Sequence, residues 1–369
     1  MSRVVWILGA GFSKSLGGSL LPSLLSSRSA ERIRAVYGRT PGLTEGREVE
    51  IIRAILEKDG WEQKDRPPAW IDAEEFLEQL DNAAFGTTGR AAVQALLHSR
   101  AQSASRPIPT PDSFESMAAA AKRMVAAECC MFLRNADPNS ERWRPYVNWA
   151  RSLEAEDTII TFNYDRVVEI ASATAGRDIE VVAGGQPVRD GLPRLLKMHG
   201  SVDWKRAGKE YLLVQDHEHA VKCEAEEIGI ASPGPSKLTL SEQWVGLWRA
   251  AEKAIREAQA IVFVGYRFPP TDSYSRERLL GAVGQNTAGP HVSVHTVLGP
   301  ETHGDQARRL DGMLKYALGQ TRRTKFPGGH LPIQSPPNYY TLLAQPLYAE
   351  DFLSLVHRQA VIDPFVFAP

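Results

Sequence analysis

Apolar residues are spaced differently in two parts of the chain. The run Val4–Leu8 is unbroken and rich in β-branched residues, which predicts a strand buried on both faces of a sheet. From about residue 20 to 153, apolar positions recur at helical spacing without a strand pattern. From Thr158 onward, apolar runs of strand length alternate with helical segments. These runs cover residues 158–162, 195–198, 227–231, 261–265 and 292–298, and a helix is expected over 242–258.

The alternation predicts an α/β fold with a Rossmann-like, doubly wound and mostly parallel sheet, which the strand at Val4 joins from across the helical interval. We therefore expect a sheet domain made of residues 1–22 and 154–369, and a helical insertion lobe made of residues 23–153. Near the end, residues 319–338 indicate a loop and residues 350–359 a last helix. Helices of the lobe are expected over 23–37, 48–58, 72–80 (capped by Asp72 and Glu75), 90–100 and 114–134.

Composition and charge narrow the class of protein. The chain has 369 residues, 43% of them apolar, which predicts a globular protein with one large domain or two ordinary ones. With 43 Lys+Arg against 44 Asp+Glu, no overall charge favours nucleic acid or an anionic membrane. No apolar stretch reaches the ~18 residues of a membrane span, and the start lacks the pattern of a secretory signal. The three cysteines include the adjacent Cys129 and Cys130, which favours a reducing cytoplasm over a disulfide framework.

The first strand ends in the loop Gly9-Ala10-Gly11-Phe12-Ser13. Glycines at a strand end permit a tight turn and let a phosphate or ribose approach the backbone amides, and the start of the next helix adds a favourable dipole. The third glycine of a dinucleotide fingerprint is not in register. A tight strand-to-helix turn that binds nothing therefore remains an alternative at this point.

Asn163 and Asp165 follow the strand at 158–162, at the edge where open α/β sheets bind ligands. Their amide and carboxylate groups are suited to one pocket, but both residues are also common turn formers and helix caps. His199 follows the next strand. A histidine side chain has an unperturbed pKa of ~6.5 and can act as a base near neutrality, although a lone histidine is more often structural.

The strand at 261–265 ends in Gly265, which permits a close approach by a ligand. Tyr266 comes next, and an acidic residue, Asp272, stands beyond a proline-rich turn. Elsewhere, the basic residues between Arg308 and Lys325 are typical of a solvated surface rather than a nucleic-acid site. Core or interface positions are expected for Trp143, Trp149, Trp244 and Trp248.

Four of these motifs, taken in order, resemble the sirtuin family and, more closely, its bacterial NAD-hydrolysing branch associated with phage defence. The motifs, between residue 4 and about residue 272, are Gly9-Ala10-Gly11-Phe12-Ser13, Thr161-Phe162-Asn163-Tyr164-Asp165, His199-Gly200 and Val264-Gly265-Tyr266. The resemblance implies that Asn163 and His199 form a catalytic pair acting on the nicotinamide–ribose bond of NAD. It implies an NAD site formed by Gly9, Ala10, Gly11, Phe12 and Ser13, with Asp165 near the nicotinamide, Gly265 near the adenosine half, and Tyr266 and Asp272 beside them.

The chain also departs from the sirtuin pattern. Protein-deacetylating sirtuins carry two Cys-x-x-Cys pairs between the His-Gly strand and the later glycine strand, whereas this interval holds only Cys223, so we expect no metal. A loop with Asp216, His217, His219 and Cys223 is the alternative metal site, but its alternating charges are typical of a solvated loop. The Asp-Phe-Arg motif of deacetylases is also missing after the glycine loop. Both differences favour hydrolysis of NAD over deacylation.

The resulting hypothesis is a cytoplasmic NADase that releases nicotinamide and ADP-ribose as a toxic effector of anti-phage defence. A zinc-independent deacylase or ADP-ribosyltransferase is one alternative, and a nucleotide-sensing module without turnover is another. Unrestrained NAD hydrolysis would kill the cell, and the ~100 residues after Asp272 leave too little chain for a separate sensor domain. We therefore expect a homo-oligomer controlled by self-assembly or by a second protein of a defence system, such as one that handles nucleic acid.

Overall fold

The computed structural model describes most of the sheet domain and part of the lobe. Several of the expectations above lie outside the described residues: the helices over 23–37 and 48–58, the cap at Asp72, the histidine His217, and most of the loop over 319–338. The described residues are 3–20, 24–25, 52, 73–86, 90–91, 93–95, 113–183, 191–208, 210–214, 216, 219–232, 234, 243–302, 304–324 and 338–364.

A single parallel sheet forms the centre of the molecule. Its order, among the described residues, is β10 (Arg323–Thr324), β11 (Tyr339–Gln345), β9 (His291–Val297), β8 (Ala260–Val264), β1 (Val4–Leu8), β2 (Thr158–Thr161), β4 (Arg194–Lys197) and β3 (Glu180–Val182). Every pairing in this sheet is parallel. The first strand therefore joins the sheet from across the helical interval, as the sequence predicts, and the structure places it between β2 and β8.

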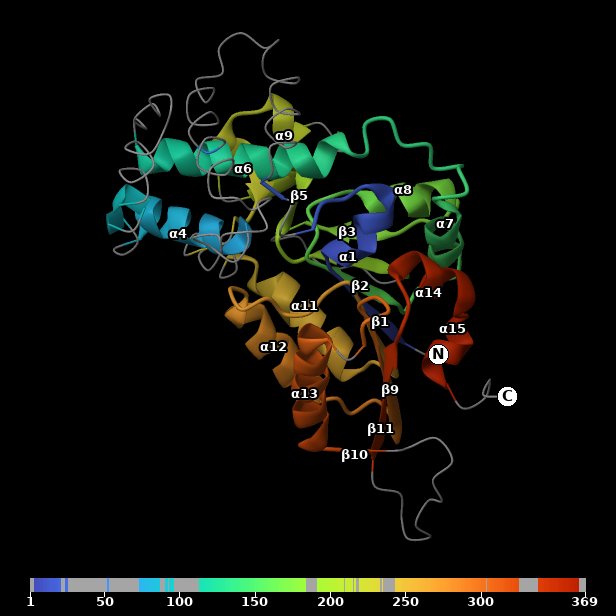
Figure 1. Cartoon of the computed structure of the whole chain (residues 1–369). Coiled ribbons are helices and arrows are strands. Elements are labelled where there is room, and N and C mark those ends of the chain that lie inside the picture. Colours follow the sequence, from blue (N-terminus) through green and yellow to red (C-terminus); the bar gives the residue numbers. More distant parts are fainter. Residues whose placement is uncertain are drawn as a thin grey trace, which may run out of the picture.

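Strand β1 is buried throughout because both faces of the sheet are covered by helices. Val5 and Ile7 belong to one apolar core, whereas Val4, Trp6 and Leu8 belong to another. Figure 1 shows the two helical layers on either side of the sheet. One layer holds α11 (Val245–Arg256), α12 (Ser273–Gly284) and α13 (Asp305–Gly319); the other holds α7 (Arg144–Arg151), α8 (Val167–Thr174), α14 (Ala349–Leu355) and α15 (Arg358–Ile362). The doubly wound α/β architecture is thereby confirmed.

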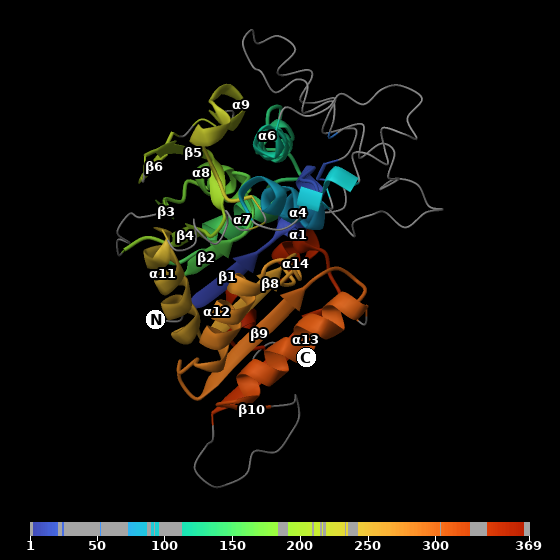
Figure 2. The same cartoon turned by 90° about the vertical axis from the view of Figure 1, so that its left-hand side faces the viewer.

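A second body lies beyond the carboxyl ends of the strands (Figures 1 and 2). Helix α4 (Ala73–Phe85) packs on α6 (Phe114–Met131), and Phe76, Leu77 and Leu80 supply the apolar face of α4 at helical spacing. The Ser113 side chain caps α6 by accepting a hydrogen bond from the Ser116 N–H. These helices share a core with α9 (His219–Lys222) and with the antiparallel strands β5 (Gly200–Ala207) and β7 (Ile228–Ile230), beside which β6 (Glu210–Leu213) pairs with β5.

The structure corrects three details of the sequence-based prediction. The run at 227–231, expected in the parallel sheet, forms β7, which pairs antiparallel with β5 in the second body. The single helix expected over 350–359 is divided into α14 and α15. Helix α7 falls within the interval expected to form the lobe, yet it packs on the main sheet, because Trp149 makes an edge-on ring contact with Trp6 at 5.5 Å.

Other features agree with the sequence-based expectations or extend them. Trp143, Trp149, Trp244 and Trp248 are all buried, and the three cysteines form no disulfide. No helix in the described part of the chain combines the length and apolar character that a membrane span requires. Residues 339–345, after the expected loop, add strand β11 to the sheet, a strand that the sequence pattern did not reveal.

Candidate active site

A cavity of about 480 Å³ opens at the carboxyl ends of the central strands. Strand β1 lies between β2 and β8, and the chain connections run in opposite directions from it across the sheet. The cavity therefore lies at the switch point, where doubly wound sheets bind ligands. Its volume is within the range of about 300–1,000 Å³ typical of small-molecule sites. Gly9, Asn163, His199, Gly265 and Leu298, which follow β1, β2, β4, β8 and β9, all contribute to its wall.

The glycines of the first loop bring two strand ends together. A Cβ atom on Gly11 would lie 2.6 Å from the Gly265 Cα, and Gly265 itself has a left-handed φ of 65°. The Gly9 N–H donates to the Val264 carbonyl (3.0 Å), and the Gly11 N–H donates to the Gly265 carbonyl (3.3 Å). These two amides are therefore already bonded within the protein, which corrects the expectation that they receive a phosphate or ribose.

The helix that follows the glycine loop is also shorter than the pattern suggested. Helix α1 (Ala10–Ser13) has four residues and continues as the 3-10 turn η1 (Lys14–Leu16). A helix of one turn adds little dipole, so the favourable field expected from it is small. Gly9, Ala10, Gly11 and Ser13 nevertheless line the cavity.

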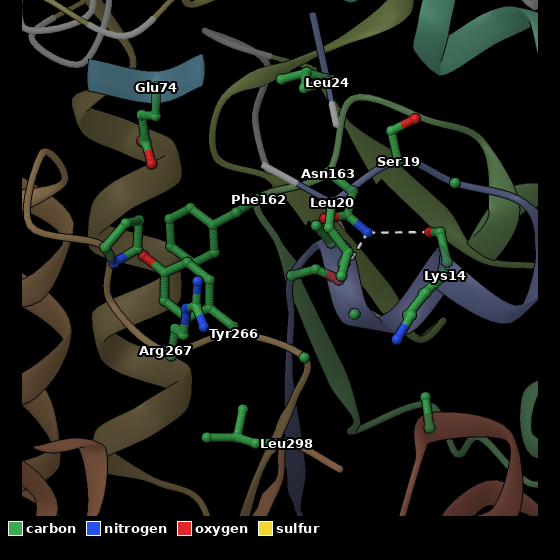
Figure 3. A pocket seen from close by; sticks show the side chains of 18 of the residues that line it. Lys14, Ser19, Leu20, Leu24, Glu74, Phe162, Asn163, Tyr266, Arg267 and Leu298 are labelled. Atoms are coloured by element: carbon green, nitrogen blue, oxygen red, sulfur yellow. Dashed lines mark hydrogen bonds between the residues drawn. The ribbon is translucent and has the colours of Figure 1, made fainter. Parts of the chain in front are cut away.

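Ser13 connects two of the residues predicted for the site. The Asn163 Nδ2 donates to the Gly9 carbonyl (3.0 Å) and to the Ser13 Oγ (3.1 Å), and the Ser13 hydroxyl donates to Asp165 Oδ2 (2.8 Å). The other carboxylate oxygen, Asp165 Oδ1, accepts the Val167 N–H at the start of α8 (3.0 Å). Asp165 thus binds the first N–H of α8, whose N-cap is Arg166, and also orients the Asn163 amide through Ser13. Figure 3 shows Asn163 beside the glycine loop in the cavity wall.

Burial raises the pKa of the Asp165 carboxyl, although the Val167 N–H, the Lys197 charge and the Ser13 hydroxyl act in the opposite direction. The Lys197 ammonium is itself buried at the end of β4. It lies 2.7 Å from Glu169 Oε1 and donates to the Asp165 backbone carbonyl at 2.5 Å. A buried cation therefore holds the Asp165 backbone next to the cavity.

Phe12 is the one predicted site residue that does not line the cavity. Its ring is buried beneath the loop and makes edge-on contacts with Tyr146 at 5.1 Å and Trp149 at 5.4 Å. The Tyr146 hydroxyl also donates to the Phe12 carbonyl (2.8 Å). The Phe12 ring therefore anchors the loop to the core.

His199 follows β4 and is 6% exposed in the cavity wall. Its Nε2 lies 3.5 Å from Asp272 Oδ2, and its ring makes an edge-on contact with Phe162 at 4.9 Å. The Tyr266 hydroxyl donates to the same Asp272 oxygen (2.9 Å), and the Tyr266 ring stacks on Phe162 at 4.0 Å. Burial and the neighbouring Asp272 raise the pKa of Tyr266 well above its usual value. Asp272 and the aromatic rings together fix the orientation of the histidine.

Sequence reasoning missed several residues of the cavity wall. Leu298 follows β9, so the strand-end rule was sufficient to find it. Lys14 and Arg267 carry positive charge to the wall, and the Lys14 ammonium lies 5.3 Å from the ring centre of Tyr348. Glu74 comes from α4 in the second body, where no local pattern points to a site. Figure 3 shows Lys14, Glu74 and Arg267 around the same cavity.

The described residues of the alternative metal loop are engaged in other ways. Asp216 forms an ion pair with Lys222 at 3.0 Å. Burial lowers the pKa of His219 and raises that of Cys223. Over the described ranges, no group of three or more His, Cys, Asp or Glu side chains is arranged to hold a metal ion.

The sheet, the cavity at its switch point and the polar strand ends define a doubly wound α/β protein with a candidate ligand site at the carboxyl ends of its strands. Residues 157–313 match the family model of the SIR2-like domain, so this segment of the chain is similar to the sirtuin family. The matched segment contains Asn163, His199 and Gly265 and begins after the Gly9–Ser13 loop. The SIR2-like family uses NAD. A comparison with curated proteins found no match to the chain.

Proposed function

We propose that this protein is a sirtuin-like NAD glycohydrolase, which cleaves the nicotinamide–ribose bond to release nicotinamide and ADP-ribose. The observation that carries the proposal is the placement of Asn163 and His199 at the ends of the adjacent strands β2 and β4, in the wall of one cavity. The wall also suits the remainder of NAD. Lys14 and Arg267 offer positive charge to a diphosphate, and Phe162 and Tyr266 offer aromatic surface.

The Asn163 amide is oriented by groups that accept its protons. A backbone carbonyl can only accept, so the bond to the Gly9 oxygen requires the NH₂ side of the amide to face the loop. Within the described part of the chain, no donor contacts the Asn163 Oδ1. This oxygen is thus available to a water or ribose hydroxyl. Departure of nicotinamide leaves positive charge on the ribose in an oxocarbenium-like state, which an oriented dipole stabilises.

His199 contributes a ring whose orientation is set by Asp272. The Asp272 carboxylate accepts hydrogen bonds from the Tyr266 and Ser275 hydroxyls. These bonds keep it beside the imidazole independently of any ligand. We expect the His199 ring to hold a hydroxyl of the ribose, which positions the reacting carbon against Asn163. The shortage of cysteines for a zinc module favours hydrolysis over deacylation, because the interval that carries four thiolates in deacetylases has only Cys223.

We also propose that the enzyme acts in anti-phage defence and that its activity is controlled. Glu74, Leu77 and Val125 reach the cavity from α4 and α6, so the second body covers the site. We propose that this cover, together with homo-oligomerisation and a second protein of the defence system, keeps the activity low until infection. Unrestrained hydrolysis of NAD is toxic to the cell, so the activity must be controlled. A change in the position of the cover changes the access of NAD to the cavity.

The test is to incubate the purified protein with NAD alone and to measure free nicotinamide by chromatography. The His199→Ala and Asn163→Ala variants should each lower turnover by at least ~10²-fold, with melting temperatures close to that of the wild type. Asn139→Ala, at an exposed position outside the cavity, is the matched control. Dialysis against a strong chelator should leave both stability and activity unchanged.

Several results would contradict this proposal. Full activity in either variant would refute the catalytic role of Asn163 and His199. Unfolding of His199→Ala would favour a structural role for that histidine. Nicotinamide release only in the presence of an acylated peptide or another acceptor would support the deacylase or ADP-ribosyltransferase alternative. Tight binding of NAD with no release at all would support a sensing module.

A further inference from the structure

Glu74 is an acidic side chain that the second body supplies to the cavity. It lies in the first turn of α4, is 5% exposed and belongs to the cavity wall. Figure 3 shows its carboxylate extending from α4 toward the rings of Phe162 and Tyr266. Burying a carboxylate in a largely apolar wall is costly, so its presence beside the cavity requires an explanation.

The surroundings of Glu74 place it at the end of the cavity that holds His199. Burial is the main cause that raises the pKa of both Tyr164 and Tyr266, and the negative charge of Glu74 raises both further. The Tyr164 ring is 6.3 Å from the His199 ring, and Tyr266 binds the carboxylate that orients His199. Glu74 therefore faces the reacting end of the cavity from the side opposite the strand ends.

The other acidic residues of the cavity wall have different surroundings. Asp165 accepts the Ser13 hydroxyl and the Val167 N–H, and Asp272 accepts the Tyr266 and Ser275 hydroxyls. Asp305 is exposed to solvent, with a side chain 91% accessible, and Glu301 is also exposed. Of the five acidic side chains in this wall, Glu74 is the one that α4 supplies, and Figure 3 shows it directed toward the Phe162 and Tyr266 rings, the first of which contacts His199.

We propose that the Glu74 carboxylate accepts a proton from the water that attacks the ribose during NAD hydrolysis. In this step the water oxygen bonds to C1′ of the ribose, and the bond from C1′ to the nicotinamide nitrogen breaks. The bonding electron pair leaves with neutral nicotinamide, and the proton passes from the water to Glu74 and then to solvent. Asn163 and His199 hold the ribose from the strand side, which leaves the proton of the water to a group on the opposite side.

This inference rests on the proposed NADase function and adds a consequence of its own. The water-activating group and the ribose-holding groups belong to different bodies of the molecule, because Glu74 is on α4 and the others follow β2 and β4. Hydrolysis then requires Glu74 to remain at the cavity wall while a change elsewhere in the cover admits NAD. Binding of the reaction product ADP-ribose, in contrast, depends mainly on the strand ends.

The experiment compares Glu74→Gln with Glu75→Gln, a matched change at the next position of the same helix, outside the cavity wall. Nicotinamide release is measured at an enzyme concentration high enough to follow a slow basal rate. A general base contributes about 10²–10⁴-fold, so Glu74→Gln should lower kcat by at least ~10²-fold, while Glu75→Gln stays within about twofold of the wild type. The affinity for ADP-ribose, measured by calorimetry, should change less than about threefold in Glu74→Gln, since the base is not needed for binding.

A second variant separates proton removal from a structural effect. Azide is an anionic nucleophile with no proton to be removed, so added sodium azide should restore nicotinamide release in Glu74→Ala and form the azide adduct of ADP-ribose. Failure of azide to restore release, together with weakened ADP-ribose binding, would reduce Glu74 to a structural residue. An active wild type with an equally active Glu74→Gln would overturn the inference alone. A wild type that releases no nicotinamide would overturn the proposed function and this inference together.

Discussion

Replacing Lys197 with methionine should lower the free energy of unfolding by about 3–5 kcal/mol, the usual cost of removing one partner of a buried ion pair. Lys197 ends β4, two residues before His199, and its side chain is fully buried. Its ammonium is 2.7 Å from Glu169 Oε1 and also bonds the Asp165 carbonyl. Methionine fills a similar volume, but it leaves the buried Glu169 carboxylate without its cation.

Chemical denaturation followed by tryptophan fluorescence measures this cost, provided that the slope with denaturant stays constant. Lys205→Met is the matched control, because the Lys205–Glu227 pair is 3.0 Å long with side chains 41% and 37% exposed. An exposed pair contributes about 0–1 kcal/mol, so the control should remain close to the wild type. The double variant Lys197→Met/Glu169→Leu should recover most of the lost stability, since it removes both charges. If Lys197→Met costs no more than Lys205→Met, the buried pair does not stabilise this edge of the site.

Two further predictions concern pH and assembly. Burial raises the pKa of Asp165 in the folded protein, so its contribution to stability is present at low pH and declines as pH rises through the raised value. Asp165→Asn should therefore gain stability relative to the wild type as pH rises above ~4, the usual pKa of an aspartate. A difference that is constant with pH would refute this. Light scattering together with the nicotinamide assay should show a homo-oligomer of low activity, and a monomer that hydrolyses NAD at full rate without a partner would refute the proposed control.

The parallel sheet was predictable because its central strands are apolar runs. β1 and β8 consist of apolar residues that are all buried, and strands covered on both faces need no polar alternation. The strand ends then predicted a site, since the carboxyl ends of parallel strands share one edge. Asn163, His199 and Gly265 line the same cavity for that reason.

Helical spacing predicted α4 and α6 of the second body, but not its strands, because their sequence pattern does not identify which elements they pair with. β5 contains Asp203 and Lys205 and lacks an apolar run, yet Asp203 is buried and forms an ion pair with Arg166 at 2.9 Å. β7 has the apolar run of a central strand but pairs with β5 instead. Glu74 reaches the cavity only because α4 packs over the strand ends. This is a tertiary contact, and the spacing of residues along the sequence does not predict it.

The glycine motif illustrates how a correct pattern can have a different physical cause. Gly11 and Gly265 were expected to admit a ligand, but each occupies the space that a Cβ of the other would need. Their close approach joins the loop after β1 to the loop after β8 and so determines where Ser13 lies. Ser13 in turn orients the Asn163 amide and binds Asp165. The glycines are therefore required for the geometry of the polar residues, and the chemistry of the site depends on Asn163, His199 and the carboxylates around them.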